Sequence, residues 1–75
     1  MGQQNTVRIY VKLEGEGTDV WRPVEADHLS GDEYQILSDR TDESEIWQFD
    51  TDDVVRCRKR IMDGETCLVA FALAD

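Results

Sequence analysis

The sequence predicts an all-β domain: a small five- to six-stranded antiparallel barrel of SH3-like or OB-like shape, with at most one helical turn. Three observations support this fold class. Apolar residues recur at every second position near the start of the chain, the later apolar runs are short and separated by polar turns, and no long stripe has helical spacing. Closure into a barrel is expected because an open sheet of this size would leave one face and two edges uncovered.

The period-two segment is TVRIYVKL, residues 6–13. Its apolar residues alternate with Arg8, Tyr10 and Lys12, which is the pattern of a strand with one buried face. The glycines of the following EGEG stretch predict a turn.

A second strand is expected over Asp19–Ala26. Pro23 cannot donate a ladder hydrogen bond, so we expect this strand to lie at an edge or to bend at a bulge. Because Trp21 alternates with Val20 and Val24, either the tryptophan or the two valines face solvent. The DHLSGDE stretch that follows predicts a turn region, with one helical turn at most.

Four further strands are predicted in the second half of the chain. EYQIL, residues 33–37, is short and precedes an acidic loop. IWQFD, residues 46–50, is expected to be a strand that places Trp47 and Phe49 in the core, because a small barrel needs its large side chains inside. VVRCRKRI and TCLVAFAL are the last two strands and meet at MDGE.

The register of this last hairpin decides which face its arginines share. The final strand has a bulky face, formed by Cys67, Val69, Phe71 and Leu73. A two-residue Asp63–Gly64 turn would put the arginines on this face, which is costly if the face is core. We therefore expect a three-residue loop, Met62–Gly64, with Gly64 left-handed. The expected pairs are Val55 with Phe71, Cys57 with Val69, and Lys59 with Cys67. Cys57 and Cys67 would then share one face, and Lys59 would point inward at the end of the barrel.

Length and composition indicate one domain, residues 1–75, with no cofactor. Two cysteines do not make a disulfide scaffold, and no apolar run approaches the ~18 residues of a membrane span. His28 is the only histidine, and no catalytic frame, phosphate loop, zinc ligand set or complete calcium loop is present. We expect a cytoplasmic protein that is not an enzyme, binds no metal, and is a monomer or weak dimer.

Half of the positive charge lies in one short segment of an acidic chain. Eight Lys and Arg residues stand against seventeen Asp and Glu, for a net charge of -9. Arg56, Arg58, Lys59 and Arg60 fall within DVVRCRKRI, and the three arginines alternate along one face. We favour the interpretation that acids of the same chain neutralise this row, at roughly 0–1 kcal/mol for each surface pair.

The acidic surface is the first candidate binding site. It would repel phosphate backbones and attract basic protein surfaces, so direct nucleic-acid binding is not expected. The function predicted is a non-enzymatic inhibitor or immunity-type module for a basic protein or nucleoprotein, although solubility alone would also explain the charge. The predicted contact residues are Trp21, Asp39, Asp42, Glu43, Glu45, Asp50, Asp52 and Asp53.

The alternative is a barrel that binds an anionic ligand or peptide, because arginine contacts carboxylate and phosphate in a bidentate manner. Its site would combine Trp21 with Arg22, Arg56, Arg58 and Arg60. The two interpretations differ in whether the arginines of the row are paired with carboxylates of their own chain.

The order VWRPVEADHL, EYQIL, IWQFDTDDVVRCR and GETCLVAFAL resembles a group of small bacterial proteins of unknown function. They share a Trp-Arg-Pro-Val segment, a Tyr-x-Ile-Leu strand, a Trp-x-Phe strand and a Val-Arg-Cys turn into the last hairpin. The resemblance covers residues 20–73 and implies a compact β-barrel without implying an activity. One departure is DTDD, which stands where a turn containing glycine is expected.

Overall fold

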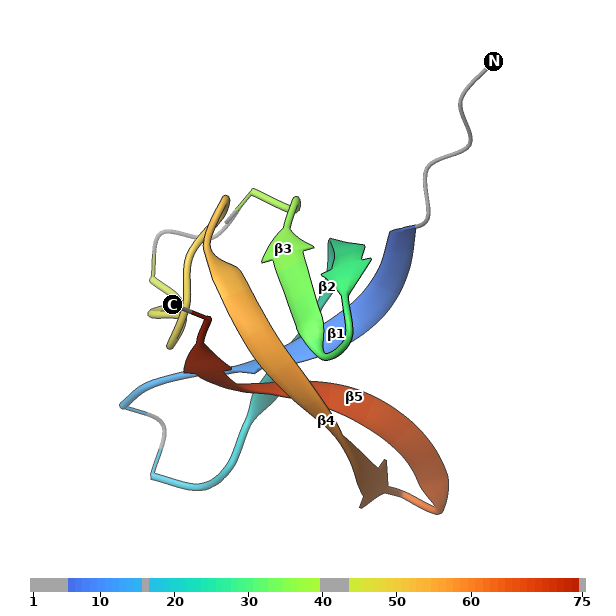
Figure 1. The fold of residues 1–75 in the computed structure, drawn as a ribbon. Helices are drawn as coiled ribbons and strands as arrows, with labels where there is room; N and C mark the ends of the chain where they lie inside the picture. The colour runs from blue at the N-terminus through green and yellow to red at the C-terminus, as the bar shows by residue number, and fades with distance from the viewer. Residues whose placement is uncertain (1–5, 16, 40–43, 75) are drawn as a thin grey trace.

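The computed structural model describes residues 6–15, 17–39 and 44–74. These residues form a closed barrel of five strands that follow one another around it in chain order, and they contain no helix (Figure 1). The predicted small all-β barrel is therefore confirmed. The strands are β1 (Thr6–Lys12), β2 (Trp21–Ser30), β3 (Glu33–Ile36), β4 (Val54–Met62) and β5 (Glu65–Leu73).

Four of the five strand pairs are antiparallel, and the pair that closes the barrel is parallel. This follows from the odd number of strands, because β1 and β5 of a five-stranded meander run in the same direction. The meander order also differs from the Greek-key order of an OB fold. The closing seam has a single pair, Tyr10 with Val69.

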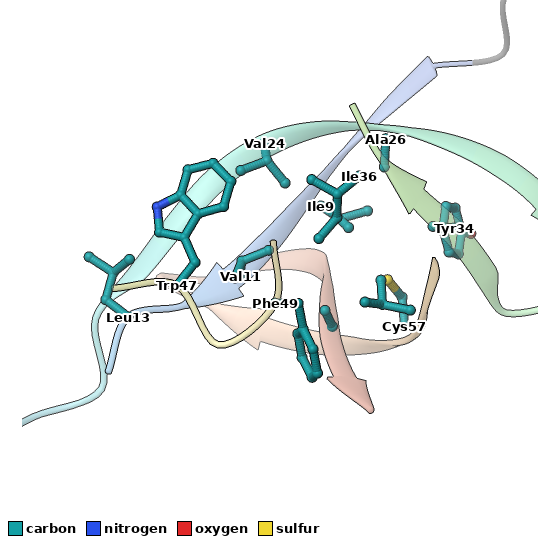
Figure 2. Close-up of a cluster of buried hydrophobic side chains, with 12 residues drawn as sticks. Ile9, Val11, Leu13, Val24, Ala26, Tyr34, Ile36, Trp47, Phe49 and Cys57 are labelled. Atoms are coloured by element: carbon teal, nitrogen blue, oxygen red, sulfur yellow. The ribbon is translucent and has the colours of Figure 1, made fainter. Parts of the chain in front are cut away.

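The alternation expected in the first strand is present. Ile9 and Val11 are completely buried, and Leu13 continues the same face just beyond β1. Figure 2 shows these side chains pointing into one cluster with residues from the other strands. The cluster consists of Ile9, Val11, Leu13, Val24, Ala26, Tyr34, Ile36, Trp47, Phe49, Val55, Cys57 and Ala70.

The expected strand at residues 46–50 is absent. This segment has only an isolated bridge between Trp47 and Leu13, flanked by backbone hydrogen bonds to the residues on either side of Leu13. Its two aromatic side chains are nevertheless core, as predicted, with Trp47 6% and Phe49 8% exposed. A five-stranded barrel encloses little space, and these two rings complete its core from a loop without adding a sixth strand (Figure 2).

β2 is longer than the sequence suggested. It continues through Ser30, so the expected turn region at DHLSGDE is reduced to the tight turn before β3 at Glu33. The ring of His28 stacks on that of Tyr34 across the two strands at 4.6 Å. Pro23 pairs with Tyr10 of β1, while the pairing of β2 with β3 begins only at Ala26, so proline occupies a locally unpaired edge of a strand that is otherwise central.

The register predicted for the β4–β5 hairpin is wrong. Asp63 and Gly64 form a two-residue turn with φ of 53° and 81°, and Met62 pairs with Glu65. Positive φ at both central residues defines a type I′ turn, for which Asp-Gly is a preferred sequence. The three-residue loop is expected only if the bulky face of the final strand is core, but the β5 residue in the core cluster is Ala70, from the other face.

A bulge in β5 shifts the register of the hairpin between Arg56 and Cys57. Cys57 pairs with Ala70 and Arg56 with Ala72, so Phe71 has no partner of its own. Ala70 is buried in the core cluster, whereas Phe71 is 38% exposed. On β5, Ala70 joins the core cluster and Leu68 packs against it, while Phe71 faces outward.

The fold predicts that Trp47 is a main determinant of stability. Trp47→Ala should lower the free energy of unfolding by about 3–5 kcal/mol because it removes a large buried side chain from a small core. Urea denaturation followed by circular dichroism would measure this change. The matched control is Gln48→Ala at the exposed neighbouring position, which should change stability by less than about 0.5 kcal/mol. Equal effects of the two substitutions would contradict the role assigned to the loop.

Candidate functional site

The alternating arginines lie on the outside of the β4–β5 hairpin, as predicted. Arg56, Arg58 and Arg60 are all exposed. Lys59 is exposed as well, although its position in the alternation is the inward one, because this part of the hairpin extends beyond the core (Figure 1). Its partner Leu68 is only partly buried against the core, and Lys59 itself stays exposed, so no burial of its charge is needed.

Two of these arginines lie over aromatic rings. The guanidinium carbon of Arg58 is 4.8 Å from the centroid of the Phe71 ring, and that of Arg60 is 5.4 Å from the Trp21 ring. Both distances are within the ~6 Å range of cation–π attraction. We call Trp21, Arg58, Arg60 and Phe71 the arginine–aromatic face.

The expected neutralisation of the arginine row by acids is not seen within the described part of the chain. The ion pairs found there are Lys12 with Asp19, at 3.3 Å, and Arg22 with Glu45. Neither pair involves the row. Arg58 and Arg60 are thus positioned by aromatic rings, which leaves the edge N–H groups of each guanidinium able to meet an acceptor.

A groove of about 560 Å³ borders the arginine–aromatic face. Tyr10, Val20 and Trp21 line it from the β1–β2 end, and Arg60, Ile61 and Met62 line it from the hairpin. Asp19 and Asp63 complete its lining. Trp21 is half-buried beside the groove, whereas Val24 is 3% exposed, which settles that the tryptophan and not Val24 lies on the outer side.

The acidic segment, residues 39–53, does not form one continuous binding surface. Glu45 receives hydrogen bonds from Arg22 and from the indole N–H of Trp47, the latter at 3.1 Å, and its side chain is only 13% exposed. This carboxylate therefore holds the loop that fills the barrel. The same contact occupies Arg22, which separates it from the other arginines of the predicted anion site.

The remaining acids of that segment have different environments. Asp53 accepts a hydrogen bond from the backbone N–H of Asp50 at 2.8 Å, and Asp52 has a left-handed φ of 73°. These features form the turn that stands where a glycine was expected. Asp39, Asp50 and Asp52 are exposed. Asp42 and Glu43, also predicted contact residues, lie outside the described residues.

The two cysteines lie on opposite faces, contrary to the prediction that they share one. Cys57 pairs with Ala70 and is buried, while Cys67 pairs with Arg60 on the outer side. Burial, reinforced by the charge of Asp32, raises the pKa of Cys57 to about 12. Across residues 6–15, 17–39 and 44–74, no group of three His, Cys, Asp or Glu side chains is placed to hold a metal ion, and no helix is long and apolar enough to cross a membrane.

Several residues of this site were not expected from the sequence. The sequence pairs Phe71 with Val55. It indicates no role in binding for Tyr10, Ile61 or Met62. The signal that would have found Phe71 was the Asp63–Gly64 pair, because its type I′ geometry turns the bulky face outward beside the arginines.

Comparison of the chain with protein-family models, curated proteins and solved structures found no match. The resemblance to small bacterial proteins with a Trp-Arg-Pro-Val segment remains a prediction. The fold and its surface therefore define only the class: a small closed β-barrel with an arginine–aromatic face.

The different environments of the two thiols predict different reactivities. At pH 8, iodoacetamide should modify Cys67 at least ~100-fold faster than Cys57, because only the thiolate reacts and a pKa near 12 suppresses it. Peptide mass spectrometry would measure the two rates, with denatured protein as the control in which both react. The folded pKa lies above the unfolded value, so this thiol stabilises the fold below about pH 8.5 and loses that contribution as the pH rises toward 12. Equal native rates would contradict the placement of Cys57.

Proposed function

We propose that this chain is a non-enzymatic protein-binding module whose arginine–aromatic face binds an acidic segment of a partner protein. The observation that carries the proposal is the placement of Arg58 and Arg60 on the Phe71 and Trp21 rings, beside a groove and without a described carboxylate partner. This is the anionic-peptide alternative drawn from the sequence, with Arg22 and Arg56 left out of its site and Phe71 added.

The composition of the face supports a protein partner. Trp, Tyr and Arg dominate the energetics of protein interfaces, and Met and Phe are enriched in them. The face and its groove contain all five types: Trp21, Tyr10, Arg58 and Arg60, Met62, and Phe71. Contact with a ring restrains each guanidinium in advance, so less side-chain entropy is lost when a carboxylate binds.

The net charge of -9 does not prevent an acidic partner from binding here. At physiological ionic strength the screening length is about 8 Å, so acids farther than this from the hairpin are screened, whereas Asp19 and Asp63 line the groove itself. Local contacts with the arginines then determine the stability of the complex. The acidic remainder of the surface slows association, so added salt should raise the association rate even while it weakens the close contacts.

The proposal assigns no catalytic role. His28 stacks on Tyr34, and one of its ring nitrogens is 2.8 Å from the carbonyl oxygen of Gly31, so both interactions involve its own turn. We place the module in the cytoplasm, where the two thiols stay reduced, as a monomer or weak dimer that needs no cofactor. A nucleic acid is the less suitable partner, because its backbone charge extends beyond the hairpin to the acids of the surrounding surface.

The test uses a short synthetic peptide in which Glu alternates with Val, compared with the same peptide carrying Lys in place of Glu. Isothermal titration should show binding of the acidic peptide, and Arg60→Glu should weaken it at least ~10-fold because it removes a charged contact and adds repulsion. Lys59→Glu is the matched control: it makes the same change of charge at the adjacent, opposite-facing position and should alter affinity less than about 3-fold. Equal losses would show that only net charge matters. Tighter binding of the Lys peptide, or of an oligonucleotide, would overturn the proposal.

A second candidate function is the one first suggested by the acidic segment: binding of a basic protein by an inhibitor or immunity-type module. The observation that favours it is the exposure of Asp39, Asp50 and Asp52 on a chain with a net charge of -9. Glu45 and Asp53 have structural contacts, so this surface is smaller than the sequence suggested.

This candidate predicts that neutralising the three exposed aspartates slows association with the Lys peptide by ~10-fold or more at low salt, because steering depends on local charge. Asparagine is the suitable replacement, since it tolerates the left-handed backbone at Asp52. Stopped-flow kinetics would measure the rates. The control is a triple variant with the same change of charge elsewhere: Glu14→Gln, Glu25→Gln and Asp32→Asn. Similar slowing by both sets would assign the effect to net charge and remove this surface as a site.

A further inference from the structure

The outer half of the β4–β5 hairpin is a two-stranded ribbon with two unpaired edges. The pairing of β3 with β4 ends at Arg56, and the seam between β1 and β5 consists of the single pair at Val69. Residues 59–68 consequently pair only with each other among the described strands. In Figure 1 this ribbon extends away from the rest of the barrel.

The turn geometry determines which backbone groups lie on each edge. In a two-residue hairpin the residues that flank the turn, Met62 and Glu65, exchange hydrogen bonds, and bonded and non-bonded pairs then alternate along the ladder. Arg60 and Cys67 therefore bond each other. Thr66 does not bond β4, so its N–H and C=O point outward along the free edge of β5.

An independent contact supports this alternation. The N–H of Cys57 donates to the carbonyl oxygen of Asp32 at 2.8 Å, on the side of β4 away from β5. Lys59 is two residues further along β4 and so presents its N–H to that same side. The ribbon thus has a β5 edge at Thr66, facing β1, and a β4 edge at Lys59, facing away from it.

We infer that the acidic partner segment binds as an extended strand added to the β5 edge at Thr66. This inference rests on the proposed function and specifies its binding mode. Strand addition uses backbone hydrogen bonds for affinity and alternate side chains for specificity. The β5 edge lies on the side of β1, whose Tyr10 lines the groove together with Arg60, and the hairpin supplies the positive charge that complements the acidic strand.

The β4 edge is the less suitable of the two. Lys59 occupies its inward-facing position, and an inward-pointing charge on an edge strand is a common protection against strand addition. Thr66 is neutral, exposed and β-branched, which favours an extended neighbour. The bound segment should carry acids at every second position, facing the arginines, with apolar residues between them.

The experiment compares two substitutions at one position in the full chain, with the Glu–Val peptide as the probe. Thr66→Pro removes the outward N–H and should weaken binding at least ~10-fold, whereas Thr66→Ala keeps the N–H and should stay within ~3-fold of the parent. Lys59→Pro tests whether proline on the other edge has the same effect, and it should not exceed Lys59→Ala in its loss. Equal affinities of Thr66→Pro and Thr66→Ala would overturn the inference.

Amide hydrogen exchange of the unsubstituted protein provides a second measurement, independent of whether the proline variants fold. Saturation with the Glu–Val peptide should slow exchange at Thr66 at least ~10-fold and leave Lys59 unchanged. If Arg60→Glu weakens binding while the Thr66 amide gains no protection, the peptide contacts the face through side chains alone, and this inference fails while the proposed function stands. If the acidic peptide does not bind at all, both are overturned.

Discussion

The filling of a five-stranded barrel by two aromatic rings is the constraint on which the rest of this structure depends. Trp47 and Phe49 enter the interior from a loop that contributes only one isolated bridge to the sheet. A barrel of so few strands encloses little volume. Ala26 and Ala70, which are 0% and 2% exposed, contribute small side chains to the same core cluster. The Arg22–Glu45 pair and the hydrogen bond from Trp47 to Glu45 hold the loop in place.

The outer surface is a consequence of that interior. Ala70 of β5 belongs to the core cluster, whereas Phe71, at the bulge, faces outward and lies beneath Arg58. The Asp63–Gly64 turn sets the register that brings Arg60 level with Cys67 on the same side. The arginine–aromatic face thus results from packing inside the barrel and from turn geometry at its end, and neither cause is specific to binding.

The charged side chains fall into two sets: those that bond within the chain and those that remain able to contact a partner. Glu45 and Asp53 bond within the chain, and Lys12 pairs with Asp19. Arg58 and Arg60 are held by rings, whose attraction to a cation leaves the edge of the guanidinium accessible. An aromatic ring thereby orients an arginine without neutralising it, which a carboxylate cannot do. This difference is the reason for assigning the binding role to the hairpin ahead of the acidic loop.

The sequence by itself determined the features that depend on neighbours along the chain. Alternation identified the buried face of β1, the apolar size of Trp47 and Phe49 predicted their burial, and the alternation of Arg56, Arg58 and Arg60 placed them outward. Only the tertiary structure decided which face of β5 is core, that residues 46–50 fill the barrel without joining the sheet, and which acid holds Arg22. These outcomes depend on the volume left inside a closed barrel and on contacts between residues distant in the chain, neither of which a local pattern of polar and apolar residues specifies.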